Sequence, residues 1–244
     1  MTVEAFTELV GPAAGGRVYA RPARSGFADC APTGRVRLDA LACWLQDIAF
    51  ADVEDAGLTS LAVWVVRRTR IRVRRFPCFG EHYELSTFCS GLGRMWAERR
   101  TTLIGIGDAA GDVEAVSLWV HLDPRDRRPM PFTPQEVAAY GDAAAGRRVT
   151  ARLRHPAPPA SGDRDRWRFR ATELDVAGHI NNAAYWKPLE EDLVVGREPE
   201  RIDAEIEYRT PSQPGEKLIV RDGPRRWIVS DEGETHASIV IAER

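Results

Sequence analysis

Cysteine is scarce in this sequence: the 244 residues include four, Cys30, Cys43, Cys78 and Cys89. No two of them stand in a Cys-x-x-Cys spacing, and no histidine lies at zinc-finger spacing from them. A disulfide framework and a zinc site are therefore both disfavoured. We expect reduced thiols, no metal and no other cofactor.

Long apolar runs and a strong net charge are also missing. No stretch approaches the roughly 18 apolar residues of a membrane helix, and residues 1–16 show no basic start followed by an apolar block. We therefore expect a cytoplasmic protein without a membrane span or a signal peptide. The net charge of −2 gives no reason to expect nucleic-acid binding.

Apolar residues recur at helical spacing over about 38–56, with Asp39 near the start and Gly57 just beyond the end. A second helix is predicted over about 182–195, and Pro188 inside it should kink it. A stretch rich in proline and alanine at 155–163 is typical of a linker. The strand-like segments are 64–75, 82–89, 97–104, 113–123, 167–171, 202–209, 217–221, 226–230 and 236–242.

The two halves of the chain resemble each other, because each has one long helix followed by strands. Residues 75–81 and 209–216 form similar turns, with an arginine, a proline and a final Gly-Glu pair in the same order. One helix on one sheet leaves apolar surface uncovered, and pairing two such units covers it. The sequence predicts an α+β protein with a unit at 1–142, a linker at 143–165 and a second unit at 166–244.

The densest group of polar residues stands where the second helix should begin. Asn181 or Asn182 is a good N-cap, and the free backbone N–H groups of a helix start favour a developing anion. The Asp175 carboxylate, six residues ahead of Asn181, could hold a water against an acyl carbon. An ordinary loop, in which Asp175 and His179 make turn hydrogen bonds, fits the same spacing at least as well.

Residues 173–185 resemble the motif of the acyl-acyl-carrier-protein thioesterase family, Asp-x-Asn-x-His-Val-Asn-Asn. Other landmarks of the family match at 41–57, 64–81, 90–94, 99–100, 127–129 and 207–209, so that the likeness spans most of residues 18–242. The resemblance implies two tandem hotdog domains, each a long helix wrapped by an antiparallel sheet. It also implies a fatty acyl substrate in a tunnel and no metal.

The resemblance further implies roles for residues of this cluster. Asp175 would act as general base or nucleophile, as the acid at this position does in simpler hotdog thioesterases. His179 would orient Asp175 or the water, and backbone N–H groups near Asn181 would hold the oxyanion. The sequence departs from the family at Ala177, where the family has asparagine, and at Pro211 and Ser212, where it has glutamate and cysteine.

Substrate contacts and a docking face are also predicted. We expect Trp44, Trp64 and Tyr185 to line the acyl tunnel, with plain core packing as the alternative. Four arginines alternate along one predicted strand and therefore share one of its faces. They are Arg68, Arg70, Arg72 and Arg74. This face is either exposed to solvent or a docking surface for the acidic acyl carrier protein.

The sequence therefore predicts a thioesterase of fatty acid biosynthesis that releases free fatty acid from acyl carrier protein. An acyl-CoA thioesterase and a non-catalytic acyl-binding hotdog protein are the alternatives. A hotdog hydratase is disfavoured, because its usual Asp-x-Asn-x-x-His arrangement is missing. Both a monomer and a homodimer are compatible with the sequence, since a tandem hotdog already contains the pairing that single hotdogs obtain by dimerising.

Overall fold

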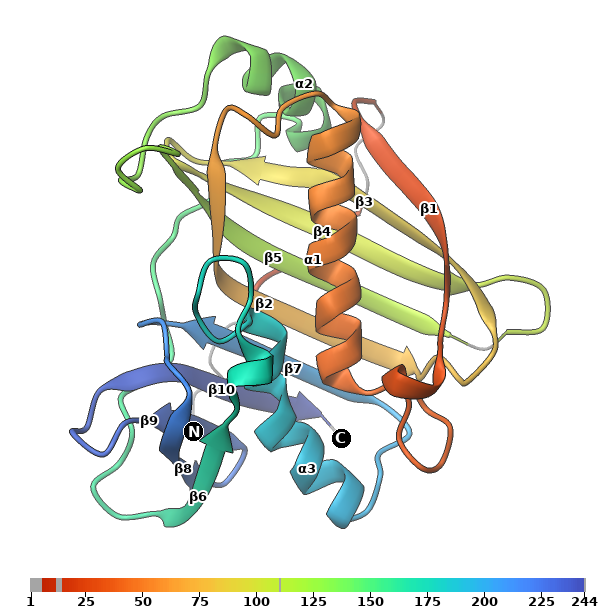
Figure 1. The fold of residues 1–244 in the computed structure, drawn as a ribbon. Coiled ribbons are helices and arrows are strands. Elements are labelled where there is room, and N and C mark those ends of the chain that lie inside the picture. Colours follow the sequence, from red (N-terminus) through yellow and green to blue (C-terminus); the bar gives the residue numbers. More distant parts are fainter. Residues whose placement is uncertain (1–5, 12–14, 110, 244) are drawn as a thin grey trace.

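The computed structural model describes residues 6–11, 15–109 and 111–243. In this part of the chain ten strands form one antiparallel sheet, in the order β1-β3-β4-β5-β2-β7-β10-β9-β8-β6, with the long helix on one face (Figure 1). The strands are β1 Val18–Arg24, β2 Val63–Arg75, β3 His82–Leu92, β4 Trp96–Gly105, β5 Asp112–Leu122, β6 Asp163–Phe169, β7 Ile202–Tyr208, β8 Gly215–Asp222, β9 Arg225–Val229 and β10 Thr235–Glu243. The helices are α1 Leu38–Asp55, α2 Pro134–Ala144 and α3 Lys187–Val195, with short 3₁₀ turns η1 Phe27–Asp29, η2 Ala171–Glu173 and η3 Asn182–Trp186.

The sheet consists of two halves with the same plan. The order β1-β3-β4-β5-β2 in the first half is repeated as β6-β8-β9-β10-β7 in the second. The halves join edge to edge where β2 pairs with β7, from Arg68 opposite Glu207 to Val73 opposite Ile202. The tandem α+β architecture predicted from the sequence is thereby confirmed.

Helix α1 packs against the sheet and against the second half. Its buried face carries Leu41, Leu45 and Ile48, as the helical spacing predicts, and one apolar core includes them together with Trp186 and Leu189 of the second half. The first turn of α1 is capped across the domains: Glu190 on α3 accepts the backbone N–H of Leu38 at 2.9 Å and a hydrogen bond from Arg35 at 2.6 Å.

The second helix differs from the expected single helix. Residues 182–186 form the 3₁₀ turn η3, and the α-helix starts only at Lys187, with Pro188 in its first turn. The predicted kink at Pro188 is therefore wrong. A first-turn proline fits because its missing N–H would have no intrahelical acceptor there.

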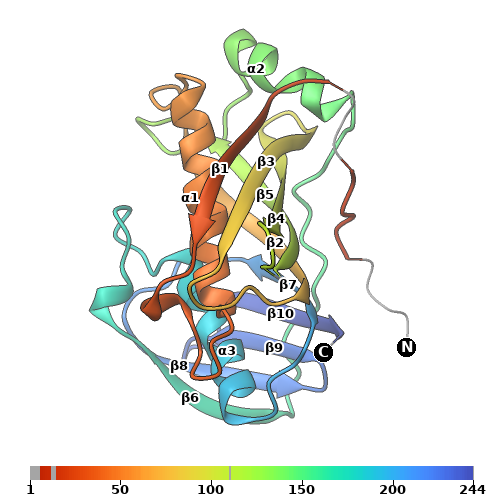
Figure 2. The same cartoon turned by 90° about the vertical axis from the view of Figure 1, so that its right-hand side faces the viewer.

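Two elements were not anticipated, the edge strand β1 and helix α2. The start of α2 nevertheless has a local signal, because Thr133 and Glu136 form a reciprocal capping box and Pro134 is the first helical residue. After α2 the chain runs along the face of the sheet opposite α1 to reach β6 (Figure 2). The expected linker at 143–165 overlaps this stretch, and the domain boundaries themselves stay a prediction.

No helix in the described ranges is long and apolar enough to cross a membrane. The expected lack of a signal peptide concerns residues 1–16, and residues 1–5 and 12–14 of that segment lie outside the described part.

Candidate active site

A cavity of about 550 Å³ lies between the two halves of the molecule. One side is formed by α1 and the start of β2, and another by strand residues of β3, β4 and β5 together with α2. The turn before η3 supplies the remaining wall with Asp175 and Ala177, followed by Asn181. Apolar side chains such as Ala49, Val53 and Leu92 dominate the lining, so the cavity suits an acyl chain.

The turn that carries Asp175 is held by its own backbone. The Asp175 N–H donates to the His179 carbonyl at 2.9 Å, and the Gly178 N–H donates to the Asp175 carbonyl at 3.0 Å. Gly178 has a φ of 75°, a conformation that favours glycine. One carboxylate oxygen of Asp175 accepts the Ala177 N–H at 2.9 Å. Asp175 is half-buried in the cavity wall, and within the described ranges its second carboxylate oxygen accepts no hydrogen bond.

Asn181 joins this turn to the first half of the molecule. Its side-chain oxygen caps η3 by accepting the Ala183 N–H at 2.9 Å, and it also accepts Gln46 Nε2 of α1 at 3.0 Å. The expected N-cap role of Asn181 is confirmed. The sequence does not predict this contact of Gln46, because its partner lies 135 residues away along the chain.

His179 does not join the cluster in this structure. It is exposed, it does not line the cavity, and its ring makes no hydrogen bond to any described residue. The reason is local, because residues 176–179 form the exposed tip of the turn. The structure therefore brings Asp175 and Asn181 together at the cavity but leaves His179 in solvent.

The three aromatic residues expected at the substrate lie in different places. Trp64 lines the cavity and stacks on Phe132, with 5.8 Å between ring centroids. Trp44 lies outside the cavity wall, 6.4 Å from the Tyr83 ring. Tyr185 is buried and does not line the cavity. Its hydroxyl accepts the Ser212 N–H at 2.9 Å and so stabilises the turn at 209–216.

The row of arginines is also placed differently from the expected exposed face. Arg68 and Arg70 are only 5% and 7% exposed, because β7 presents acidic residues directly beside them. Arg70 binds Asp203 through two hydrogen bonds of 2.8 and 2.7 Å, and Arg72 shares that carboxylate at 2.8 Å. Arg68 and Arg70 are thus inaccessible to a docking partner. Arg74, whose side chain is 54% exposed, is the most accessible of the four.

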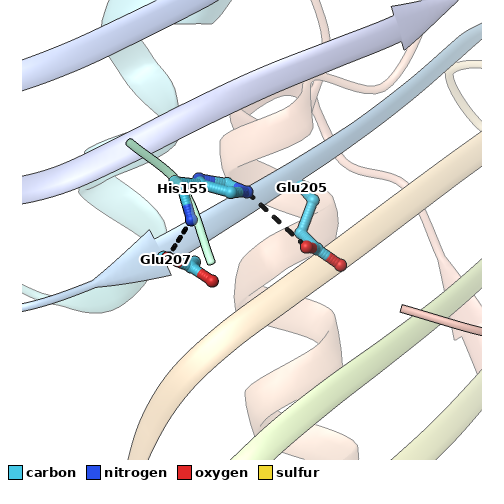
Figure 3. A group of neighbouring side chains, drawn as sticks. All are labelled: His155, Glu205 and Glu207. Carbon is cyan, nitrogen blue, oxygen red and sulfur yellow. Dashed lines mark hydrogen bonds and ion pairs between the residues drawn. The ribbon is translucent and has the colours of Figure 1, made fainter. Parts of the chain in front are cut away.

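One group with metal-binding geometry occurs in the described ranges, formed by His155, Glu205 and Glu207 (Figure 3). The His155 backbone N–H donates to Glu207 at 3.0 Å, and its ring lies 3.5 Å from Glu205. Burial would raise the pKa of Glu205, but hydrogen bonds from His155 and Thr7 lower it to about 2.

The charge of this group is already balanced by cations. Arg68 lies 3.9 Å from Glu205 and 3.8 Å from Glu207, and Arg154 approaches Glu205 to 3.5 Å. The contacts of Arg154 and His155 attach the chain between α2 and β6 to the sheet. We therefore interpret the group as a buried cluster of ion pairs and hydrogen bonds that stabilises the fold, not as a metal centre.

Comparisons with known proteins show the family to which the chain belongs. The sequence model of the acyl-ACP thioesterase N-terminal domain matches residues 16–140, and that of the C-terminal domain matches residues 157–241. The chain belongs to the acyl-ACP thioesterase family. The tandem hotdog fold expected for a family member is confirmed by a solved acyl-ACP thioesterase from Bacteroides thetaiotaomicron, which superposes with a TM-score of 0.77 at 18% identity and covers 93% of this chain and 98% of that one.

Two curated relatives match the sequence at low identity. An uncharacterized protein of Mycobacterium tuberculosis is 27% identical over 215 residues, which cover 87% of this chain and 85% of the relative. A chloroplastic acyl-[acyl-carrier-protein] hydrolase of Cuphea viscosissima is 26% identical over 154 residues, 60% of this chain and 37% of the relative. The name of the Cuphea relative agrees with the family assignment.

Proposed function

We propose that this protein hydrolyses the thioester of a fatty acyl group carried on acyl carrier protein and releases the free fatty acid. The observation that carries the proposal is the Asp175 carboxylate, which has no cationic partner in the described ranges and stands in the wall of a largely apolar cavity. Family membership supplies the reaction class.

In the proposed reaction the acyl chain occupies the apolar part of the cavity, and the thioester carbonyl lies near Asp175. Acting as general base, the carboxylate takes a proton from water while the water oxygen bonds to the carbonyl carbon. The expected group of backbone N–H donors near Asn181 reduces to that of Asn182 at the start of η3, which we assign to the oxyanion, because the N–H groups of Ile180, Asn181, Ala183 and Ala184 donate to protein acceptors. The C–S bond then breaks and the thiolate takes the proton. A thiol has a pKa of about 8.5, so the leaving group needs no strong acid. Direct attack by Asp175 is the alternative route.

The choice of carrier rests on the relatives. The Cuphea relative is described as an acyl-[acyl-carrier-protein] hydrolase, and its likeness to this chain favours the same carrier here. With that carrier the reaction is the release step of fatty acid biosynthesis, which we place in the cytoplasm.

A matched pair of substrates tests the proposal. Acyl-ACP and acyl-CoA with the same chain are incubated with purified protein, and free fatty acid is measured. We expect a higher kcat/KM with acyl-ACP. A higher kcat/KM with acyl-CoA would show that acyl-CoA is the substrate. Binding of either acyl thioester without release of fatty acid would show that the protein is not a thioesterase.

A further inference from the structure

His121 on β5 is fully buried and packs against the aromatic part of the cavity wall. The centroid of its ring lies 5.0 Å from that of Trp64 and 4.9 Å from that of Phe132. The Trp64 and Phe132 rings both line the cavity, whereas His121 does not. The three rings form one cluster, in which the imidazole supports the two rings that a substrate in the cavity would meet.

Both nitrogens of the His121 ring face acceptor atoms. Nδ1 lies 2.8 Å from the backbone carbonyl oxygen of Met130, which can only accept a hydrogen bond. Nε2 lies 2.8 Å from a carboxylate oxygen of Glu136 in the first turn of α2. A neutral imidazole has a single N–H and can donate to only one of these two atoms. With Glu136 ionised, the geometry therefore requires the doubly protonated ring, an imidazolium.

Glu136 carries the negative charge of this pair. Its second oxygen accepts both the backbone N–H and the hydroxyl of Thr133, each at 2.8 Å. Burial alone would raise the pKa of this carboxyl, but the hydrogen bonds from His121 and Thr133 lower it. Burial alone would lower the pKa of His121, but its hydrogen bonds to Glu136 and to the Met130 carbonyl raise it. The two side chains therefore form a buried ion pair.

This ion pair connects three elements of the cavity wall. Strand β2 contributes Trp64, and the segment before α2 contributes the Met130 carbonyl and the Phe132 ring. Helix α2 contributes Glu136, which is the one charged side chain paired with the His121 ring in the described ranges. Loss of one ring proton would leave either the carbonyl or the carboxylate without its donor, and a buried acceptor without a donor is destabilising.

We propose that His121 is a positioning residue, whose buried imidazolium fixes the aromatic wall of the acyl cavity and the start of α2. This inference rests on the proposed function, because it takes the cavity as the site of the acyl chain. The protonated ring holds Trp64 and Phe132 in the positions in which they line the cavity. When the ring loses a proton, one of the two hydrogen bonds is lost and the acyl chain binds more weakly.

The first test titrates the ring in the wild-type protein and needs no activity. NMR signals of the ring nitrogens, assigned to His121 by their loss in His121→Gln, show whether one or both nitrogens carry a proton. We expect both to be protonated at the ordinary histidine pKa of about 6.5, with one proton lost only above it. A ring with a single proton at that pH would overturn the inference.

The second test follows kcat and KM for acyl-ACP across pH. As pH rises through the titration of His121, KM of the wild type should rise about 10-fold at nearly unchanged kcat, because a misfit of one methylene in an apolar pocket is worth about 10- to 200-fold. His121→Gln should lack this transition. Glu136→Gln keeps the capping box but removes the charge beside a buried ring, so the transition should move to lower pH. His82→Gln, at an exposed histidine of β3 outside the cavity wall, is the matched control and should behave as wild type.

Each outcome decides the inference. A KM transition that persists in His121→Gln, or that stays at the wild-type pH in Glu136→Gln, would overturn it and leave the proposed function intact. A transition carried by kcat instead of KM, or one lost in His82→Gln, would also overturn it. If the wild type hydrolyses neither acyl-ACP nor acyl-CoA, the proposed function fails, and calorimetric binding of dodecanoic acid across the same pH range decides the inference. A Kd that rises as the ring titrates would support it, and a constant Kd would overturn it.

Discussion

At the scale of single residues, the availability of Asp175 depends on how its turn is stabilised. The backbone bonds between Asp175, Gly178 and His179 close the turn without the carboxylate. Two nearby acids are committed elsewhere: Glu173 pairs with Lys187 at 2.6 Å, and Glu190 caps α1. Asp175 is therefore the acid of this segment that can act on a substrate.

Replacing Asp175 by asparagine should remove the base and keep the shape. General base catalysis typically contributes about 10²–10⁴-fold, so we expect kcat to fall at least about 100-fold. The melting temperature should barely change, because asparagine can still accept the Ala177 N–H. Steady-state hydrolysis beside a melting curve measures both effects. Near-normal turnover of the folded variant would move the chemistry away from Asp175.

His179→Ala should leave kcat close to the wild-type value. The ring is exposed and has no hydrogen-bond partner among the described residues, so its removal leaves the cavity intact. The same steady-state hydrolysis assay measures kcat of this variant. A loss as large as that of Asp175→Asn would show instead that the two residues act as one unit when substrate is bound.

At the scale of elements, the junction of β2 and β7 is held by charge as well as by the ladder. Across the junction, Arg70 on β2 and Asp203 on β7 form a buried pair, and Asp203 has its pKa lowered because hydrogen bonds from Arg70 and Arg72 outweigh the effect of burial. The arginines that the sequence predicts on one face of a strand therefore help to join the two halves of the sheet at β2 and β7.

Arg70→Glu should destabilise the protein strongly, because it leaves the buried Asp203 unpaired and adds a like charge. Breaking a buried pair costs about 3–5 kcal/mol. Arg74→Glu is the control on the same strand, since its side chain is 54% exposed and its ion pairs with Asp112 and Glu114 are surface pairs, each worth about 0.2–1 kcal/mol. Urea denaturation measures both variants, and equal free energies of unfolding would show that the Arg70 pair contributes no stability.

At the scale of the whole molecule, the two hotdog units share one core and one sheet. Helix α1 contacts η3 and α3, and the apolar core combines Leu41 and Ile48 with Trp186 and Ile206. The cavity also takes its wall from both units. Neither unit has a complete core of its own or encloses the cavity alone.

The isolated segments 1–150 and 160–244 should therefore not be stable alone. Each would expose the apolar surface that the other covers and an unpaired edge strand, β2 or β7. Differential scanning calorimetry of each segment should show no cooperative transition. A cooperative transition from monomeric 160–244 would contradict the shared core.

The sequence alone determined the elements whose signals are local. Apolar spacing located α1, alternation located most strands, and the Asn181 cap located the start of η3. The motif within residues 173–185, together with landmarks spread over most of residues 18–242, suggested the family, because residue types and short spacings can be read from the sequence directly.

Only the tertiary structure decided what depends on distant neighbours. Arg70 is buried because Asp203, 133 residues further along the chain, lies beside it, and periodicity cannot reveal a partner so remote. Gln46 meets Asn181 because α1 packs beside the Asp175 turn of the other unit, whereas His179 stays outside the cavity because the tip of that turn is exposed to solvent. Local patterns specify which face of an element is apolar, but long-range packing selects which polar groups meet at the cavity.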